Sequence, residues 1–246
     1  MKRILLTGGN GFLGSRLQAA YGRDCELLSV DINELDLRVK HRVKDAVNLF
    51  KPDYVIHTAA IAQTGVCNEN PEKCRAVNVD GAVNVAEACA AVGAKMVFCS
   101  TEQVFNGNKE PGPYGEDDVP VPDTQYGRSK LEAEERIKSI LDELWILRFT
   151  WLFGVPERSR PVAANILWDT VKAALKGRQV AVPSREYRGL TYVGELIDEF
   201  GKVFDIPYGT YHVGSMNDLD RYEIVCLILK ELGLNDRIPS LLRRDD

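Results

Sequence analysis

The chain has 246 residues, of which 45% are hydrophobic and 27% are charged; these values are typical of a folded globular protein and exclude extensive disorder. Its net charge of −5 argues against a nucleic-acid or acidic-lipid binder, which needs an excess of basic residues. No apolar stretch approaches the roughly 20 residues that span a bilayer. No signal-peptide pattern follows Lys2, so we expect a cytoplasmic protein without membrane partners.

The N-terminal part of the chain alternates short apolar runs with amphipathic stretches. The expected strands are Arg3–Thr7, Glu26–Asp31, Tyr54–Thr58, Lys95–Cys99 and Trp145–Thr150. The expected helices are Phe12–Ala20, Arg38–Phe50, Cys74–Val92 and Tyr126–Leu141. This alternation predicts an α/β fold with a Rossmann-type, doubly wound parallel sheet. The stretch Asn106–Thr124, rich in Pro, Gly and acidic residues, predicts a long binding loop or lid.

After residue 150 the alternation loosens, which predicts a smaller C-terminal lobe. The expected elements there are helices at Ala163–Lys176, Thr191–Phe204 and Arg221–Leu232, and strands at Gln179–Val182 and Gly209–Gly214. We therefore expect residues 1–151 to form the first domain, with 188–206 returning to it. Residues 152–187 and 207–246 are expected to form the smaller lobe.

The strongest local signal is the glycine-rich segment Thr7–Gly14, between the first expected strand and helix. Glycines at this spacing permit a tight turn, close approach of backbone to a pyrophosphate, and packing of the helix on the strand. The following helix N-terminus adds N–H donors and a positive dipole end. The expected cofactor-binding residues of this segment are Gly8, Asn10, Gly11, Phe12, Leu13 and Gly14.

Asp31, at the end of the second expected strand, is a candidate for the adenosine ribose. A carboxylate there can bind both ribose hydroxyls and would repel a 2′-phosphate, so we expect NAD(H) to be preferred. NADP(H) stays open because Arg38 and Lys40 are near in sequence.

Two further short segments are candidates for the cofactor site. Asp36 and Leu37 could sit beside the adenine, although Asp36 alone also fits a helix cap. The small residues of Ala59–Ala60–Ile61 let a flat cofactor lie against a strand end, or serve plain core packing.

The histidines and cysteines indicate no metal site. None of the three histidines stands at ligand spacing to another His or Cys, and His57 is expected to be a core histidine with satisfied hydrogen bonds. The six cysteines include no C-x-x-C pair, so free, mostly buried thiols are expected.

Tyr126 and Lys130 lie four residues apart and share one face of an expected helix. An ammonium near a phenol stabilises the phenolate and lowers the phenol pKa, which makes proton exchange easier near pH 7. Thr101 follows the fourth expected strand, at the sheet edge where ligands of such folds bind.

These residues together resemble those of the extended short-chain dehydrogenases/reductases, and more narrowly the dTDP-4-dehydrorhamnose reductase family. The narrower resemblance is carried by Lys51–Ile56, Ser100–Gly107, Pro113–Glu116, Tyr126–Glu134 and Leu147–Gly154. It covers about residues 1–235 and is dense up to residue 154.

The resemblance implies NAD(P)H-dependent reduction of a 4-keto deoxysugar nucleotide. Tyr126 would donate the proton, Lys130 would hold the nicotinamide ribose, and Thr101 would hydrogen-bond the carbonyl. The resemblance also implies a cofactor-binding role for Asn78, and substrate contacts for Glu102, Gln103 and Trp151. The family commonly has Asp-Tyr where this chain has Glu102–Gln103, and it usually continues beyond the position of Asp246; an abbreviated lobe or a missing C-terminal segment is therefore expected.

The expected lobe carries one independent clue to its ligand. Between Gly154 and Gly189 the chain has seven basic and three acidic residues, which suits a diphosphate. A solvated helix face is the alternative, and Arg185 and Arg188 are the preferred candidates because they lie in a loop. The expected partner is a nucleotide sugar, and a homodimer stays open.

Two other functions fit the same resemblance. One is a cofactor-binding regulatory subunit like that of methionine adenosyltransferase; the other is a nucleotide-sugar epimerase or dehydratase. The set Thr101, Tyr126 and Lys130 favours an enzyme over a pure binding module.

Overall fold

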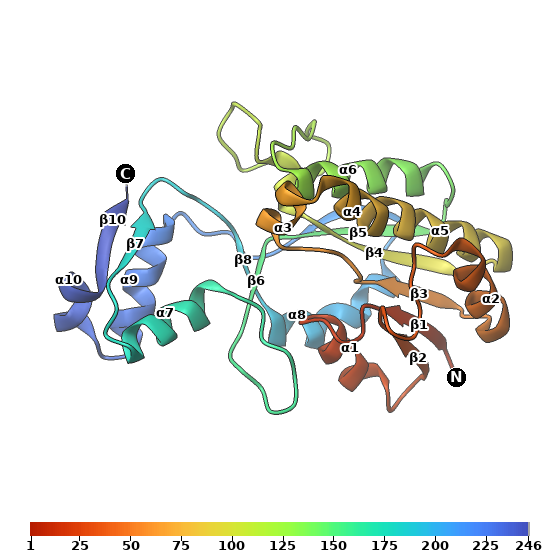
Figure 1. The fold of residues 1–246 in the computed structure, drawn as a ribbon, viewed down its shortest axis with the longest axis horizontal. Helices are drawn as coiled ribbons and strands as arrows, with labels where there is room; N and C mark the ends of the chain where they lie inside the picture. The colour runs from red at the N-terminus through yellow and green to blue at the C-terminus, as the bar shows by residue number, and fades with distance from the viewer. Residues whose placement is uncertain (246) are drawn as a thin grey trace. The chain divides into compact units, whose positions relative to one another are not determined.

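The computed structural model describes residues 1–245 and divides the chain into two units (Figure 1). The first comprises Met1–Phe149 and Phe200–Val213, and the second Thr150–Glu199 and the chain from Gly214 onward. Each unit has its own cluster of buried apolar side chains. In the described part of the chain, no helix is long and apolar enough to cross a membrane.

The first unit contains a six-stranded sheet in which every neighbouring pair is parallel. Its strand order is β2-β1-β3-β4-β5-β9. The strands are β1 (Arg3–Thr7), β2 (Glu26–Val30), β3 (Tyr54–His57), β4 (Lys95–Thr101), β5 (Leu144–Phe149) and β9 (Gly209–Val213). Their apolar runs are nearly continuous because helices cover both faces of the sheet. The prediction of a Rossmann-type parallel sheet is confirmed.

The helices of this unit lie on both faces of the sheet (Figure 1). They are α1 (Gly14–Tyr21), α2 (Lys40–Phe50), α3 (Thr64–Glu69), α4 (Pro71–Arg75), α5 (Gly81–Val92) and α6 (Gln125–Lys138), with a π-helical turn at Ala76–Asp80 and 3₁₀ turns at Glu102–Phe105 and Phe200–Asp205. Helices α2, α5 and α6 share one core with Leu5, Val55 and Met96 of the sheet. On the other face α1 meets the last 3₁₀ turn through Tyr21 and Phe200.

The second unit has two small parallel sheets, β6 with β8 and β7 with β10. The elements are β6 (Trp151–Phe153), α7 (Ile166–Leu175), β7 (Val180–Pro183), β8 (Leu190–Tyr192), α8 (Val193–Glu199), α9 (Arg221–Glu231), a 3₁₀ turn at Asn235–Arg237, α10 (Ile238–Leu241) and β10 (Leu242–Asp245). Helices α7 and α9 pack on β7 and β10 around Val182 and Leu229. A capping box begins α9, in which the Asp220 side chain accepts from the Glu223 N–H.

The structure differs from the sequence expectations in three segments. Gly209–Val213 was expected in the lobe, but it pairs with β5 and completes the main sheet. The expected helix at Thr191–Phe204 is divided among β8, α8 and a 3₁₀ turn, and the segment that belongs to the first unit is Phe200–Val213 rather than 188–206. The expected helix at Cys74–Val92 is interrupted by the π-helical turn, a distortion frequent at functional sites.

Candidate active site

The glycine-rich segment forms a tight turn between β1 and α1. Gly8 has a φ of +74°, and a Cβ there would lie 2.7 Å from the backbone nitrogen of Ala59. A Cβ at Gly14 would lie 2.1 Å from the carbonyl oxygen of Gly8. Helix α1 then begins after Leu13 without a side-chain cap. Glycine at these positions leaves the backbone N–H groups and the positive end of α1 open to an anion, so the turn fits a dinucleotide pyrophosphate.

The Asp31 carboxylate lies directly after β2, beside this turn. Its Oδ2 accepts a hydrogen bond from the Asn10 N–H at 3.0 Å, and its Oδ1 accepts one from the Ile32 N–H at 2.8 Å. These two contacts fix the carboxylate at the strand end that meets the adenosine ribose in Rossmann folds.

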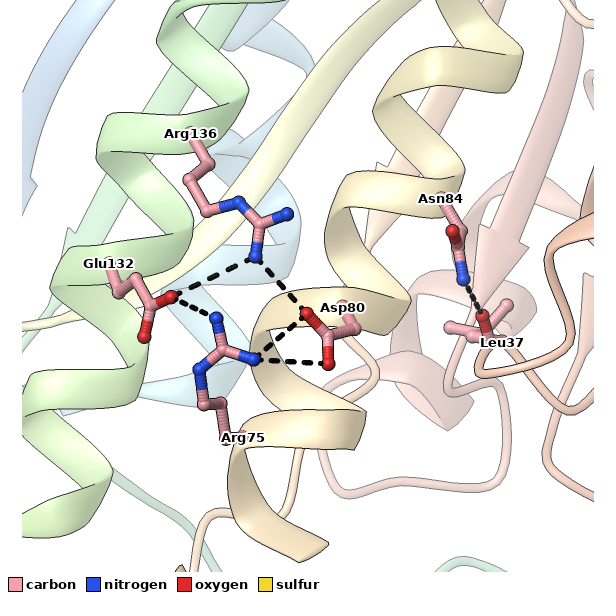
Figure 2. Close-up of polar contacts among 6 residues, drawn as sticks. All are labelled: Leu37, Arg75, Asp80, Asn84, Glu132 and Arg136. Atoms are coloured by element: carbon pink, nitrogen blue, oxygen red, sulfur yellow. Dashed lines mark hydrogen bonds and ion pairs between the residues drawn. The ribbon is translucent and has the colours of Figure 1, made fainter. Parts of the chain in front are cut away.

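Asp36 and Leu37 both make contacts within the protein. The Asp36 carboxylate accepts hydrogen bonds from Arg38, which lower its pKa. Leu37 is buried in the core of the sheet, and its carbonyl accepts from Asn84 at 2.8 Å (Figure 2). A contact of Leu37 with an adenine stays a prediction.

The Asn78 side chain forms hydrogen bonds both to the segment after β3 and to α6, the helix that carries Tyr126. Its Oδ1 accepts from the Ile61 N–H at 2.8 Å, and its Nδ2 donates to the Ile61 carbonyl at 3.1 Å and to Ser129 Oγ at 3.0 Å. Asn78 is only 1% exposed. Its amide is therefore used inside the protein, where it supports Ala59–Ile61. A cofactor-binding role for Asn78 stays a prediction.

Thr101 is the last residue of β4, and Tyr126 and Lys130 lie one turn apart on α6, which packs against that strand. Burial, and then the charge of Glu102, raise the pKa of Tyr126 above its usual value, while the Thr101 hydroxyl opposes this. The expectation that Lys130 leaves Tyr126 with a lowered pKa is wrong, because burial destabilises the phenolate and the charge of Glu102 adds to this effect. Tyr126 is accordingly a protonated phenol at neutral pH.

Lys130 is an almost fully buried ammonium, 1% exposed. Its Nζ lies 3.9 Å from the centroid of the Phe98 ring, a cation–π contact. Burial lowers the pKa of Lys130 to about 8, against the opposing effects of Cys99, Glu134 and Cys74. The ammonium form still predominates at pH 7, where it can donate hydrogen bonds to a bound hydroxyl.

A buried ion pair holds this helix to the sheet, and the sequence analysis missed it. Arg148 of β5 donates to both carboxylate oxygens of Glu134, with the shortest contact 2.7 Å from its Nη2. Ser100 donates to the same carboxylate. Glu134 lies four residues, about one helical turn, beyond Lys130, and Arg148 lies inside an otherwise apolar strand. These two features of the sequence could have indicated the ion pair.

A second, exposed charge cluster joins the π-helical turn to α6, as Figure 2 shows. Arg75 contacts Asp80 at 3.3 Å and Glu132 at 2.6 Å, and Arg136 contacts Asp80 at 3.1 Å. Each of the four side chains is between 38% and 50% exposed. Because water screens such pairs, the cluster adds less to stability than the buried pair does.

Glu102 and Gln103, the expected substrate residues of the first unit, are half-buried beside Thr101. Gln103 donates its N–H to Thr101 Oγ1 at 3.2 Å. The Gln103 Oε1 accepts a hydrogen bond from Thr64 at 3.3 Å.

In the second unit, Trp151 lies among charged side chains. The guanidinium carbons of Arg188 and Arg221 lie 4.3 and 5.0 Å from its ring centroid. Both arginines bind Glu186, with N–O distances of 2.8 and 2.9 Å. Arg185 is exposed. Trp151 and Arg188 were expected from the sequence, whereas Arg221 was not, because it lies in the first turn of α9 rather than in a loop.

No cluster of three or more His, Cys, Asp or Glu side chains that could hold a metal ion occurs among residues 1–245. All six cysteines are free thiols, and Cys67, Cys74 and Cys89 are buried.

Comparison with known proteins gives the family. A model described as the RmlD substrate binding domain matches residues 1–242. The chain belongs to this family. The resemblance to dTDP-4-dehydrorhamnose reductases, seen first in the motifs, is thereby confirmed.

Two curated relatives of this RmlD-family chain differ in what they are named for. It is 30% identical to the spore coat polysaccharide biosynthesis protein SpsK of Bacillus subtilis, over 98% of this chain and 83% of that protein. It is 27% identical to methionine adenosyltransferase 2 subunit beta of Bos taurus, over 95% of this chain and 73% of that protein.

Among solved structures, the chain resembles two that hold nicotinamide cofactors. One is dTDP-4-dehydrorhamnose reductase of Bacillus anthracis in complex with NADP, with a TM-score of 0.89 and 28% identity over 100% of this chain and 85% of that one. The other is UDP-glucose 4-epimerase of Thermus thermophilus in complex with NAD, with a TM-score of 0.81 and 27% identity over 94% of this chain and 83% of that one.

Proposed function

We propose that this chain reduces the keto group of a 4-keto deoxysugar nucleotide with a nicotinamide dinucleotide, as a reductase similar to dTDP-4-dehydrorhamnose reductase. The observation that carries the proposal is the set Thr101, Tyr126 and Lys130 at the end of β4, in the unit that also holds the glycine-rich turn. A protonated phenol one helical turn from a buried ammonium can serve proton transfer, for which a passive scaffold has no use.

The three side chains have separate tasks in this reaction. Tyr126 donates its phenolic proton to the carbonyl oxygen of the sugar as negative charge develops there, and Thr101 donates a second hydrogen bond to that oxygen. Lys130 binds the nicotinamide ribose, and its charge stabilises the phenolate left by proton donation. The bound dinucleotide supplies the hydride.

The preferred cofactor is NAD(H). Asp31 presents a carboxylate at the ribose position, and its charge disfavours a 2′-phosphate. The two nearby cations that could offset this repulsion are engaged elsewhere: Arg38 with Asp36 at 2.6 Å, and Lys40 with Glu87 at 2.6 Å. Titration of the protein with each cofactor tests the preference, and tighter binding of NADPH than of NADH would contradict it.

The second unit serves as the substrate-binding lobe in this proposal. Trp151 lines the sugar site, and Arg185 and Arg188 bind the diphosphate. Glu102 and Gln103 of the first unit contact the sugar. The Glu–Gln pair stands where the family commonly has Asp–Tyr, so the sugar of this reductase differs from that of the typical member in the group that these side chains meet.

The deciding experiment is an activity screen. The purified protein is mixed with NADH and a panel of 4-keto sugar nucleotides, and oxidation of the nicotinamide is followed by absorbance. Turnover that forms the 4-hydroxy sugar supports the proposal. Isomerised sugar without net nicotinamide oxidation would identify an epimerase instead.

A regulatory role is the second candidate, favoured by the 27% identity to methionine adenosyltransferase 2 subunit beta. A regulatory subunit is expected to turn over none of the keto sugars. It also requires a stoichiometric complex with a second protein whose activity changes on mixing. A homodimer stays a prediction, which the molar mass in solution tests.

A further inference from the structure

His57 ends β3 inside a row of side chains that crosses three neighbouring strands. The parallel register places Thr7 of β1, His57 of β3 and Phe98 of β4 side by side. The His57 and Phe98 rings stack at 5.7 Å with an angle of 14° between their planes. All three residues are at most 1% exposed.

Only one of the two ring nitrogens of His57 has a hydrogen-bond partner. Nδ1 lies 2.9 Å from Thr7 Oγ1. Nε2 is buried and, among the described residues, has no partner. A buried nitrogen without a hydrogen-bond partner is uncommon and costly, which directs attention to the charges around it. The expectation of a fully satisfied core histidine is thus only half met.

The neighbouring charge is Lys130. Its Nζ lies over the same Phe98 ring on which His57 stacks, 3.9 Å from the centroid. The other titratable groups around this ammonium are Cys99 of β4, Cys74 of α4 and Glu134 of α6. Of these, Glu134 is committed to Arg148. The Cys99 thiol is neutral near pH 7, since burial raises its pKa to about 12.

We propose that His57 is a positioning residue for Lys130, with a neutral imidazole that donates from Nδ1 to Thr7 and presents the lone pair of Nε2 to the ammonium. A cation beside Nε2 selects this tautomer, because the opposite tautomer would direct an N–H dipole at a positive charge. Burial and the charge of Lys130 also lower the pKa of His57 to about 3, which keeps the ring neutral over the working pH range. His57 itself contacts neither substrate nor cofactor.

This arrangement has a definite consequence for Lys130. A lone pair directed at the ammonium stabilises its charged form and so opposes the effect of burial. Removing the imidazole therefore lowers the pKa of Lys130 below about 8 and reduces the fraction of ammonium at neutral pH. The inference rests on the proposed function only for its effect on catalysis; the tautomer and the lysine titration belong to the protein without substrate.

The first test is ¹⁵N NMR of the ligand-free full chain, which separates protonated from unprotonated imidazole nitrogens. The chain has only three histidines, and His57→Gln assigns the signal. The expected result is a protonated Nδ1 and an unprotonated Nε2 from pH 5 to 8. A protonated Nε2, or an imidazolium at pH 7, overturns the proposal.

The second test follows the Lys130 side-chain nitrogen, assigned with Lys130→Met, in three variants. His57→Leu should lower its titration midpoint by about one pH unit, a tenfold change in acid strength. His57→Gln, which retains an acceptor oxygen, should stay near the wild type. Met96→Leu, a volume-conserving change in the same core, is the control and should leave the midpoint unchanged.

Equal midpoints in His57→Leu and Met96→Leu overturn the proposal even if His57→Leu folds less well. The predicted shift, found in a chain that reduces no keto sugar, would reject the proposed function and leave this inference standing. Reduction of a keto sugar together with an unshifted Lys130 midpoint in His57→Leu would support the proposed function and reject this inference.

Discussion

Burial controls both ionisable side chains of the proposed reaction, in opposite directions. It raises the pKa of Tyr126 and lowers that of Lys130 to about 8. At pH 7 the tyrosine is therefore a neutral acid and the lysine mostly a cation, which is the pair of states that reduction of a carbonyl requires. The same desolvation makes the phenolate costly, so proton donation by Tyr126 depends on the ammonium that remains beside it.

The role of Tyr126 as proton donor is tested by Tyr126→Phe. Removing the hydroxyl should reduce kcat by about 10²–10⁴-fold, because only general acid catalysis is lost. Affinity for NADH and the thermal midpoint should stay close to those of the wild type. Tyr211→Phe, which removes a hydroxyl that donates to the Pro207 carbonyl, is the control and should retain activity. Near-wild-type turnover of Tyr126→Phe would show that another group supplies the proton.

The lowered pKa of Lys130 predicts an alkaline limb in the pH dependence of binding and catalysis. The charged form binds the ribose and stabilises the phenolate, so kcat/KM and NADH affinity should be highest below about pH 8 and should fall as pH rises through that value. Stopped-flow turnover and NADH fluorescence titrations between pH 6 and 10 measure both. In Lys130→Met the limb should vanish together with most activity; a limb that persists there belongs to another group.

Among the structural elements, the turn between β1 and α1 depends on glycine for two separate reasons. Position 8 requires glycine both because its φ is positive and because a Cβ atom would overlap Ala59. Gly93, after α5, also has a positive φ of +71°, but a Cβ atom there would meet no other atom. Gly93→Ala should lower the free energy of unfolding by about 1–2 kcal/mol, the usual cost of a left-handed alanine. Gly8→Ala should lower it by about 1–3 kcal/mol more, because the methyl group overlaps backbone atoms. Urea unfolding measures both.

NADH affinity provides a second reading of the same pair of variants. Gly8→Ala should weaken binding strongly, because the new methyl group displaces the turn that holds the pyrophosphate. Gly93→Ala should bind NADH as the wild type does. Equal stability losses and equal NADH affinities in the two variants would contradict the assigned role of the turn.

Helix α6 is held by one buried and one exposed set of ion pairs, and these should differ in strength. Glu134→Ala leaves Arg148 buried without its carboxylate and should cost about 3–5 kcal/mol of unfolding free energy. Arg136→Ala disturbs only the exposed cluster of Figure 2 and should cost less than about 1 kcal/mol. Repeating the unfolding in 1 M NaCl should reduce the smaller effect and leave the larger one. Equal losses in the two variants would contradict this division.

At the scale of the whole chain, the first unit was more predictable from sequence than the second. Short apolar runs between amphipathic stretches are sufficient to indicate a parallel sheet, and the spacing of Gly8, Gly11 and Gly14 indicates its first turn. The position of Gly209–Val213 depends instead on pairing with β5, from which it is more than 60 residues distant. Contacts of that kind leave no local periodicity, and the same reason hid the approach of Arg221 to Trp151.

The remaining prediction separates an enzyme from a binding subunit, through the cationic groups of the second unit. In the reductase proposed here, Arg185 and Arg188 bind the substrate diphosphate. Replacing both with Glu should raise the KM for a nucleotide sugar, and each lost charge-assisted hydrogen bond is worth roughly 1.5–3 kcal/mol, or about 10- to 150-fold. NADH affinity should be unchanged, because the glycine-rich turn and Asp31 belong to the other unit.

Lys172→Glu is the matched control for this charge reversal. Lys172 carries the same charge on the same unit, but it pairs with Asp169 on α7 at 2.7 Å and has no proposed ligand contact. A regulatory subunit predicts a different result: no keto sugar turns over in any variant, and the chain copurifies with a stoichiometric partner. Loss of sugar affinity with NADH binding intact, in the Arg185/Arg188 variant alone, is the result that only the enzyme explains.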